Sequence, residues 1–401
     1  MTHMPYAQTV PARQPMFARL AMTVGAALCA GLLTASASAE LPTYRIDVIG
    51  ANLQGFGMNE SGTVVGRALT GPSNGFAFIR HPGGPVEMLP TPPEWLSSDA
   101  YAVNDSGVVV GAVSSATIAS IGSRAAAWFP TDEGYEFVFL GALAGHTYST
   151  ALGVNNLGDI VGGSGGIGIG MYSHAALFTQ SGPVNLPGIM LGADVNDNRK
   201  VLAGNVLLDL NTMQTTTIPL PPGNWQGVAT GDINNVDGFC GYIQGYSGCS
   251  TFPIIHMPGT GWEFVGGCAT TTSATSINDQ GDTLTYVYMG GINAVFHDEG
   301  VVNIGSLIAP GQGNWGITGM SIINNNRQIL GSGKLLPNGA SQLILLTPIV
   351  TGDLNGDLAV DASDLALFLG MWGSVGGDAD FDQNGIVDAA DLSVLLGAWN
   401  A

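Results

Sequence analysis

The sequence predicts an all-β protein, a seven-bladed β-propeller, followed by a small α-helical domain. Three observations lead to this prediction. The 401 residues include 60 glycines and 21 prolines and are 45% hydrophobic, which is typical of many short strands joined by tight turns. One short phrase recurs seven times between residues 44 and 348. After Pro348 this pattern is replaced by a duplicated acidic segment.

The recurring phrase reads apolar, Asn, polar, any residue and Gly, followed by a β-branched run that ends in Gly. Clear copies span residues 58–66, 103–111 and 154–162, and weaker copies begin at residues 195, 233, 277 and 323. Asn and Gly tolerate positive φ angles, and the flanking Val and Ile favour strands, so each copy predicts a β-hairpin. The asparagines that anchor the copies are Asn59, Asn104, Asn155, Asn196, Asn234, Asn278 and Asn324.

Two further strand-like segments accompany most hairpins, as in Phe76–Ile79 and Val184–Leu186. Each unit therefore has about four strands, at a period close to that of propeller blades. The alternative is an open β-solenoid, whose terminal repeats would carry polar caps. The terminal segments Tyr44–Ile49 and Leu343–Leu346 are apolar instead. Pairing them would complete one blade from both ends and leave no open edge.

Three copies of the phrase depart from the pattern. Arg199 and Arg327 stand where copies four and seven should have Gly, and copy five has one extra residue before Gly238. These departures predict looser turns in the corresponding blades.

At these residues the chain resembles the HAF-type extracellular repeat proteins, named for a His-Ala-Phe-like strand. Here that strand is His174-Ala175-Ala176-Leu177-Phe178. The resemblance covers roughly residues 44 to 348 and implies a repeat architecture, but no particular activity. We place the repeat domain at residues 40–348.

The N-terminus has the features of a secretory signal peptide. Basic residues precede an apolar run over residues 20–33, and Ala37-Ser38-Ala39 fits the small-x-small cleavage rule. The run is short for a spanning helix, so residues 1–39 predict a cleaved signal peptide and no membrane span after cleavage. Translation starts at Met1 and at Met16 both fit this prediction. The protein is expected to be secreted, either extracellular or at the cell surface.

Charge and cysteine content restrict the partners and the chemistry. The formal net charge of −20 repels phosphate backbones, so nucleic acid is not an expected partner. Export implies an oxidising environment. Cys240 and Cys249 flank a predicted hairpin and form the favoured disulfide candidate, with Cys249–Cys268 as the alternative.

Two twelve-residue acidic loops follow the repeats, at residues 353–364 and, 27 positions later, 380–391. Each precedes a helix-like segment, Leu365–Trp372 or Leu392–Trp399. Oxygen-bearing side chains stand at positions 1, 3, 5, 9 and 12, and position 7 would contribute its carbonyl. This pattern suits calcium, which binds six to eight oxygens, so two calcium ions are expected. The predicted ligands are Asp353, Asn355, Asp357, Ala359, Asp361 and Asp364 in the first loop, and Asp380, Asp382, Asn384, Ile386, Asp388 and Asp391 in the second.

The loop spacing, the Asp at position 12 and the missing helix before each loop resemble dockerin modules. The resemblance implies that residues 349–401 form a dockerin-like calcium-binding domain whose paired helices dock onto a cohesin-like protein. Two features depart from that pattern. Leu358 replaces the Gly of position 6, which usually takes positive φ. The positions that carry recognition in many dockerins hold the small residues Ala362-Ser363 and Ala389-Ala390.

We expect an exported, non-catalytic binding or scaffold protein that attaches to a partner through its calcium-binding module. The repeats would bind a glycan or a protein, with ligand residues that the sequence does not identify. Trp225 and Trp315, each after Gly-Asn, are candidates for a sugar-binding face.

The alternative is a polysaccharide-degrading enzyme, because dockerins often accompany glycoside-active domains. Such an enzyme needs two carboxylates about 5–10 Å apart. No catalytic residue is assigned, and the candidates for such a pair are Glu87, Glu94, Glu136 and Glu263.

Overall fold

The computed structural model describes residues 41–71, 75–115, 122–166, 170–192, 194–245, 251–265, 272–287, 291–296 and 300–399. The predicted signal peptide lies outside these residues, as do Cys249 and Cys268. In the part of the chain that is described, no helix is both long enough and apolar enough to cross a membrane.

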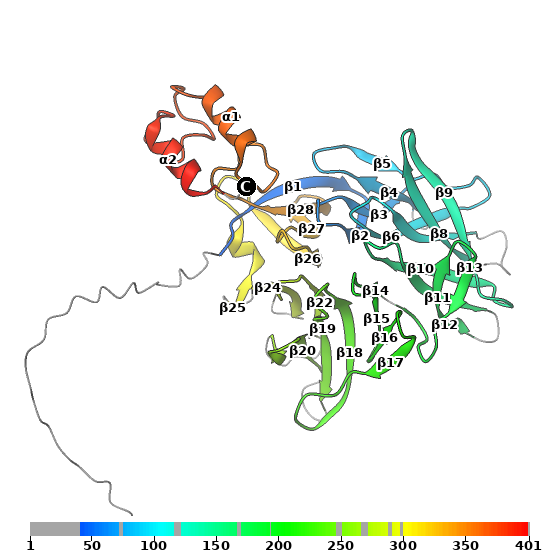
Figure 1. The fold of residues 1–401 in the computed structure, drawn as a ribbon. Helices are drawn as coiled ribbons and strands as arrows, with labels where there is room; N and C mark the ends of the chain where they lie inside the picture. The colour runs from blue at the N-terminus through cyan, green and yellow to red at the C-terminus, as the bar shows by residue number, and fades with distance from the viewer. Residues whose placement is uncertain are drawn as a thin grey trace, which may run out of the picture. The chain divides into compact units, whose positions relative to one another are not determined.

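The described residues form seven four-stranded antiparallel sheets, which are the blades of a β-propeller (Figure 1). Blade 1 contains β2 (Leu53–Met58), β3 (Val64–Leu69), β4 (Gly75–Arg80) and β5 (Val86–Met88). Blade 2 contains β6 (Ser97–Val103), β7 (Val109–Ser114), β8 (Ser123–Thr131) and β9 (Gly134–Gly141). Blade 3 contains β10 (Tyr148–Val154), β11 (Ile160–Gly166), β12 (Gly170–Thr179) and β13 (Gly182–Asn185). Blade 4 contains β14 (Asp194–Val195), β15 (Lys200–Ala203), β16 (Val206–Asp209) and β17 (Gln214–Thr217).

The other three blades follow the same order. Blade 5 contains β18 (Trp225–Ile233), β19 (Phe239–Gly245), β20 (Thr251–Met257) and β21 (Gly261–Phe264). Blade 6 contains β22 (Thr272–Ile277), β23 (Thr283–Val287), β24 (Gly291–Phe296) and β25 (Gly300–Asn303), which leads into the 3-10 helix η1 (Ile304–Leu307). Blade 7 contains β26 (Trp315–Ile323), β27 (Ile329–Leu335), β28 (Gln342–Pro348) and β1 (Tyr44–Ala51).

Blade 7 is completed by the first strand of the chain. Strand β1 pairs antiparallel with β28, with Tyr44 opposite Pro348 and Ile46 opposite Leu346. The last blade therefore takes its outermost strand from the N-terminal end, and the ring is closed. This confirms the propeller and the predicted pairing of the two terminal segments, and it excludes the open solenoid.

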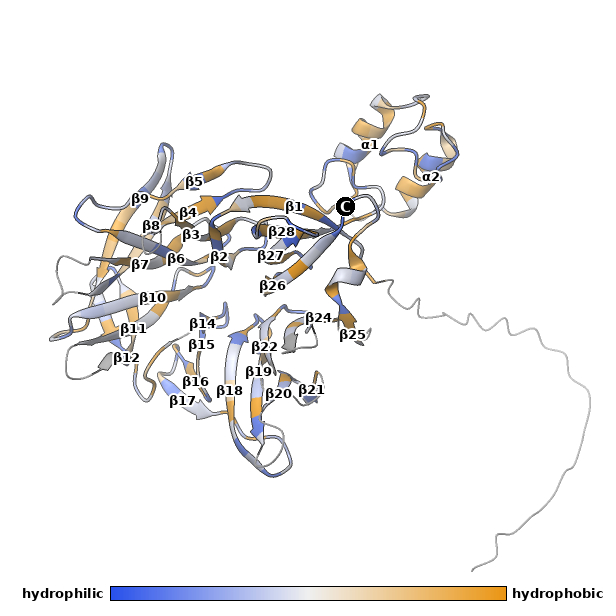
Figure 2. Ribbon diagram, turned by 180° about the vertical axis from the view of Figure 1, so that it is seen from behind, coloured by the Kyte–Doolittle hydropathy of each residue, from blue (hydrophilic) through white to orange (hydrophobic). Residues whose placement is uncertain are grey.

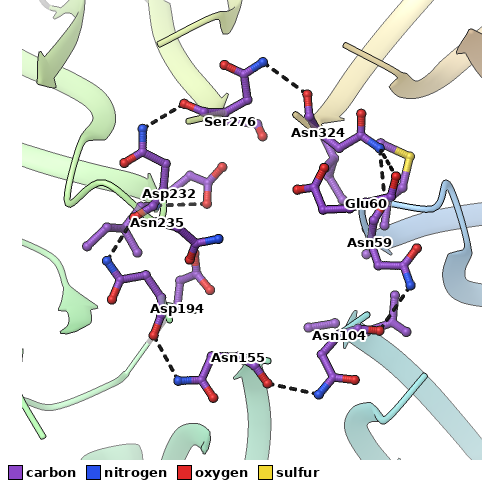
Figure 3. A pocket seen from close by; sticks show the side chains of 18 of the residues that line it. Asn59, Glu60, Asn104, Asn155, Asp194, Asp232, Asn235, Ser276 and Asn324 are labelled. Atoms are coloured by element: carbon purple, nitrogen blue, oxygen red, sulfur yellow. Dashed lines mark hydrogen bonds between the residues drawn. The ribbon is translucent and has the colours of Figure 1, made fainter. Parts of the chain in front are cut away.

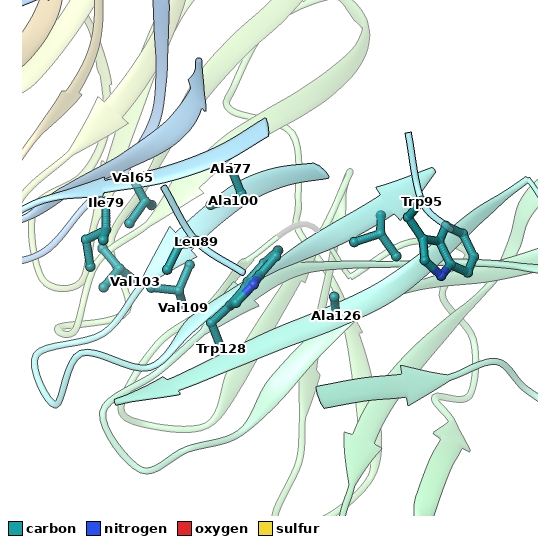
Figure 4. Packing of buried hydrophobic residues seen from close by; sticks show 11 residues of the cluster. Val65, Ala77, Ile79, Leu89, Trp95, Ala100, Val103, Val109, Ala126 and Trp128 are labelled. Atoms are coloured by element: carbon teal, nitrogen blue, oxygen red, sulfur yellow. The ribbon is translucent and has the colours of Figure 1, made fainter. Parts of the chain in front are cut away.

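The hydrophobic core lies in clusters between neighbouring blades. Figure 4 shows the cluster in which Val65 and Ile79 of blade 1 pack with Val109 and Trp128 of blade 2. The Trp128 ring is fully buried, and its Nε1–H donates to the carbonyl oxygen of Pro90 at 2.7 Å. Each blade thus buries its apolar face against the next one, as a single four-stranded sheet could not do alone.

The three departing repeat copies have the same turn as the others. Arg199, Asp237 and Arg327 adopt φ angles of 61°, 63° and 56°, at the position where Gly62 has 80°. Copy five therefore has no extra residue, because Asp237 takes the place of the glycine. The predicted looser turns were wrong, since the hydrogen bonds described below close every copy alike.

Two short helices follow the propeller strands, α1 (Ala362–Gly370) and α2 (Ala389–Gly397). Each begins three residues before the predicted segment, because an aspartate, Asp361 or Asp388, caps its N-terminus. Both helices carry apolar residues (Figure 2). The buried apolar residues in and beside these helices are Val360, Phe368, Ala379, Val387 and Leu395.

Candidate functional site: the central channel and the acidic loops

The seven anchor asparagines form a closed ring around the central channel, and Figure 3 labels Asn59, Asn104, Asn155 and Asn324. Each is buried and directly follows the first strand of its blade. Its Oδ1 accepts the backbone N–H of the residue four positions later, at 2.6–2.9 Å, and this bond closes the turn that contains the asparagine. Its Nδ2 donates to the backbone carbonyl of the next anchor asparagine, at 2.7–3.1 Å. The repeated Asn therefore serves both its own turn and the neighbouring blade.

A second ring is formed by the residues that follow the anchor asparagines. The backbone N–H of each donates to the side chain of its counterpart in the next blade, at 2.7–3.0 Å. The ring closes where Asn325 donates to Oε2 of Glu60. In order, its members are Glu60, Asp105, Asn156, Asp197, Asn235, Asp279 and Asn325.

Side-chain amides supply further hydrogen bonds to this second ring. Nδ2 of Asn156 donates to Asp105 at 2.8 Å and to Asp197 at 3.1 Å. Nδ2 of Asn325 donates to Asp279 at 2.8 Å. The aspartates of the ring are thus satisfied within the protein, and the arrangement stabilises the closed propeller without requiring a ligand.

The channel contains a cavity of about 360 Å³ lined by the first strands of all seven blades. Its walls combine both rings with larger side chains such as Phe56, Tyr101 and Leu152. A cavity of this size is large enough for a small molecule.

Two aspartates of neighbouring blades meet in this cavity. Asp194 and Asp232 are hydrogen-bonded through their carboxyl groups, and Oδ2 of Asp232 accepts the N–H of Ile277 at 2.9 Å. Burial, followed by the charge of Asp194, raises the pKa of Asp232 well above its usual range. Our sequence reasoning missed this pair. The available signal was that both stand two residues before an anchor asparagine, where Gly57 and Gly153 stand in other copies.

The structure does not bring the four candidate glutamates together. Glu87, Glu136 and Glu263 lie on β5, β9 and β21, each the last strand of its blade. Glu94 is exposed in the connection between blades 1 and 2. None of the four lines the channel cavity. The four glutamates therefore do not form a site in the channel.

The two candidate tryptophans begin the first strands of blades 5 and 7, at the opposite end of those strands from the asparagine ring. Both are half-buried. The Trp225 ring lies 5.4 Å from that of Phe252 and 5.5 Å from that of Phe264, between centroids. Nε1–H of Trp315 donates to the carbonyl of Gln312. The structure thus places an aromatic group around Trp225 on blade 5.

The acidic loops each gather three carboxylates. Oxygen atoms of Asp353, Asp357 and Asp364 lie within 4.8 Å of one another, and the same holds for the second-loop residues Asp380, Asp382 and Asp391. Oδ2 of Asp380 accepts the N–H of Gly385 at 3.0 Å, while its Oδ1 is buried without a protein partner. A buried carboxylate oxygen without a donor, next to two further carboxylates, suits a hard cation such as calcium.

The position-12 aspartates are fully buried and organise the loops. Burial alone would raise the pKa of Asp364, but the N–H groups of Asp361, Leu354 and Asn355 outweigh it and lower the pKa. The N–H of Asp388 similarly lowers the pKa of the second position-12 residue, Asp391. These carboxylates are therefore charged and oriented by the backbone.

The position-9 aspartates, Asp361 and Asp388, lie outside the two carboxylate groups and cap the helices, accepting N–H groups at 2.7 and 2.8 Å. Their capping role was missed from the sequence. Leu358 adopts φ 71°, as its position predicted, and Gly385 adopts 97° at the same place in the second loop. A leucine is strained in this region, and the second loop has a strained residue of its own, Gln383 at φ 58°, where the first loop has Gly356 at 81°.

Cys240 is fully buried on β19. Burial raises the pKa of its thiol well above the usual range. Its predicted partner Cys249 lies outside the described residues, so the disulfide stays a prediction.

Comparisons with known proteins show similarity at the level of fold. No protein-family model matches the chain, and no curated protein matches it. One similar structure is the extracellular domain of a protein assigned as a one-component system from B. thetaiotaomicron, with 12% identity and a TM-score of 0.42. The match covers 76% of this chain and spans 40% of the length of that one. Another is the native arabinanase of Bacillus subtilis, with 11% identity, a TM-score of 0.24, and coverage of 75% and 94%. At these TM-scores neither similarity carries an argument about function.

Proposed function

We propose that this is an exported, non-catalytic binding or scaffold protein whose C-terminal segment is a dockerin-like, calcium-dependent attachment module. The observation that carries the proposal is the buried Oδ1 of Asp380, which has no protein partner and lies beside the carboxylates of Asp382 and Asp391. A cation would satisfy this oxygen and offset the repulsion among the three charges.

The composition of the segment supports calcium as that cation. Residues 351–401 include nine aspartates and neither lysine nor arginine. The side-chain ligands predicted in both loops are carboxylates and amides. Calcium binds such oxygen donors, whereas transition metals favour nitrogen and sulfur donors. Asn355 and Asn384 would add amide oxygens, and Ala359 and Ile386 their carbonyls. Binding would stabilise the loops and the helices that they precede.

The surface of the two helices supports attachment to a protein partner. Leu369 is 55% exposed, Trp372 48% and Leu396 52%. Leu369 lies on α1, Leu396 on α2 and Trp372 just after α1, and large exposed apolar side chains of this kind suit contact with a protein. The partner would be cohesin-like, with a contact dominated by these apolar residues, since the neighbouring loop positions Ala362-Ser363 and Ala389-Ala390 offer only small side chains.

The channel supports a binding role for the propeller over a hydrolytic one. The side chains of both rings are engaged in blade-to-blade hydrogen bonds. The aromatic group of Trp225, Phe252 and Phe264 offers a surface for a glycan or a protein instead.

Calorimetric titration of calcium into the chain from residue 40 tests the proposal. The expected result is two sites, with one lost in Asp380→Ala and the other in Asp353→Ala. A recombinant cohesin domain should then bind in calcium and be released by a chelator. Absence of calcium binding at millimolar concentration, the weak end for extracellular modules, would refute the module. Hydrolysis of a polysaccharide panel would refute the non-catalytic role.

A further inference from the structure

The second channel ring alternates between carboxylate and amide side chains with one exception. Asn156 separates Asp105 from Asp197, Asn235 separates Asp197 from Asp279, and Asn325 separates Asp279 from Glu60. A ring of seven members cannot alternate throughout, because an odd number leaves two like neighbours. In this protein the like neighbours are Glu60 and Asp105, which are joined by the hydrogen bond from Glu60 N–H to Asp105 Oδ1 at 3.0 Å.

Glu60 also occupies the seam where the last blade meets the first. Its Oε2 accepts the N–H of Asn325 at 2.8 Å, and its backbone carbonyl accepts Nδ2 of Asn326 at 2.8 Å. The hydrogen bonds of this one residue therefore join blade 7 to blade 1 and blade 1 to blade 2.

We propose that Glu60 is a proton-sensitive contact at the propeller seam. The contact between blades 7 and 1 is more stable when the junction of Glu60 with Asp105 takes up a proton. Protonation removes the one like-charge neighbour pair of the ring. The Oε2 atom can still accept the Asn325 N–H as a carboxylic acid, so the seam hydrogen bond is kept while the repulsion is lost.

The electrostatic surroundings place this change near neutral pH. Burial is the largest influence on the pKa of Glu60 and raises it. The hydrogen bond from the Asn325 N–H lowers it, and the resulting pKa is about 7. The charged groups that face Glu60 from other blades are Asp105, Asp279 and Asp197, and all three raise the pKa. From blade 7 it is faced by the amides of Asn325 and Asn326.

The pH dependence of stability follows from these surroundings. Because the pKa of Glu60 in the folded protein lies above its ordinary value of 4.5, the protonated group favours the folded state. This contribution is fully present below pH 4.5 and is lost as the pH rises through about 7.

The test compares the equilibrium stability of the full mature chain with that of Glu60→Gln, at constant calcium. Glutamine keeps an acceptor for the Asn325 N–H and has no charge. The folding equilibrium constant of the wild type, relative to Glu60→Gln, should fall roughly tenfold between about pH 5.5 and 8.5. Hydrogen exchange at Asn325, corrected for its intrinsic pH dependence, should accelerate over the same range only in the wild type.

Two further variants keep the proposal falsifiable. Asp105→Asn removes the like pair from its other side and should also weaken the pH dependence. Asp279→Asn removes a ring carboxylate that has amides on both sides, and most of the pH dependence should remain. Equal pH profiles for the wild type and Glu60→Gln would overturn the proposal. An effect of Asp279→Asn as large as that of Glu60→Gln would also overturn it, since the ring would then respond only to total charge.

Discussion

Nδ2 of Asn324 donates to the backbone carbonyl of Asn59 at 3.1 Å, and this hydrogen bond joins residues 265 positions apart in the sequence. The same side chain accepts the N–H of Gln328 at 2.9 Å within its own turn. A single residue type thus closes a local hairpin and the whole propeller. The same bonding in every repeat explains why the anchor position is Asn in all seven copies: Asp lacks the donor, and Ser lacks the reach.

Replacing an anchor asparagine should destabilise the propeller substantially. Asn104→Ala removes the bonds to the part-buried Val108 N–H and to the buried Asn155 carbonyl, which keeps only the N–H of Gly158 as a donor. The expected cost is about 2–4 kcal/mol of unfolding free energy. Asn104→Asp keeps the acceptor and should lose less at a pH where the aspartate is protonated. Urea unfolding followed by tryptophan fluorescence measures both, and equal losses would contradict the two-bond account.

The ion pair between Arg199 and Asp159 of the preceding blade should offset the strain of the turn that contains Arg199. Nε and Nη2 of Arg199 donate to the two oxygens of Asp159, each at 2.8 Å, from a backbone with φ 61°. Arg199→Ala loses the ion pair and keeps a strained backbone. Arg199→Gly loses only the ion pair, because glycine adopts positive φ without strain. We expect Ala to be less stable than Gly by about 1 kcal/mol. The reverse order in denaturant unfolding would show that the backbone is unstrained.

The ion pair between Arg199 and Asp159 should weaken in acid. Burial tends to raise the pKa of Asp159, but hydrogen bonds from Arg199 and Asn155 outweigh it, and the pKa lies below the ordinary 3.8. The stabilisation is therefore present above pH 3.8 and is lost as the pH falls through the lower folded-state value. The stability difference between wild type and Arg199→Gly should be constant from about pH 5 to 7 and shrink below about pH 4. A difference unchanged at pH 3 would refute the ion-pair contribution.

Relieving the strain at Leu358 should strengthen the first acidic loop. Its φ of 71° corresponds to 97° at Gly385 in the second loop. Leu358→Gly should raise calcium affinity at the first site about fivefold, through roughly 1 kcal/mol of removed strain. Leu358→Ala, which keeps a Cβ, is the matched control and should not. Calorimetric titration resolves the two sites, and an unchanged affinity in the glycine variant would count against strain as the cause.

Removing the buried indole between blades 1 and 2 should have the effect of a core cavity. Trp128→Ala should cost about 3–5 kcal/mol. Trp128→Phe keeps most of the apolar contact and loses the hydrogen bond to Pro90, so a smaller cost, about 1–2 kcal/mol, is expected. Thermal unfolding by calorimetry distinguishes the two, and similar losses would indicate that the hydrogen bond dominates.

Much of the architecture could be predicted from local pattern. The recurring Asn turn, the four strands of each repeat and the pairing of Tyr44–Ile49 with the last strand follow from short-range preferences and from the need to cover an edge. The copies with Arg199, Asp237 and Arg327 were misjudged, because a strained turn can be offset by a contact with the neighbouring blade. Asp237 has such a contact, accepting from Nδ2 of Asn196 at 2.7 Å.

In the acidic loops, too, some features could be predicted from the sequence and others depend on the folded structure. The spacing of Asp353, Asp357 and Asp364 in the sequence was enough to expect that their carboxylates converge, because a twelve-residue loop is a local structure. That Asp361 caps a helix, and that one oxygen of Asp380 is buried without a partner, depends on the folded backbone around them.

By itself the sequence determined the repeats, the closing strand and the two acidic loops, because each depends on residues close together in the chain or on one edge that must be paired. Only the tertiary structure decided how the repeats interact across the channel. The pairing of Asp194 with Asp232, the exclusion of the four glutamates from the cavity, and the adjacency of Glu60 and Asp105 all arise when seven blades close on one axis. Side chains that are 38 to 51 positions apart then become neighbours, as from Asn196 to Asn234 and from Asn104 to Asn155. Their interactions depend on the number of blades, which no single repeat contains.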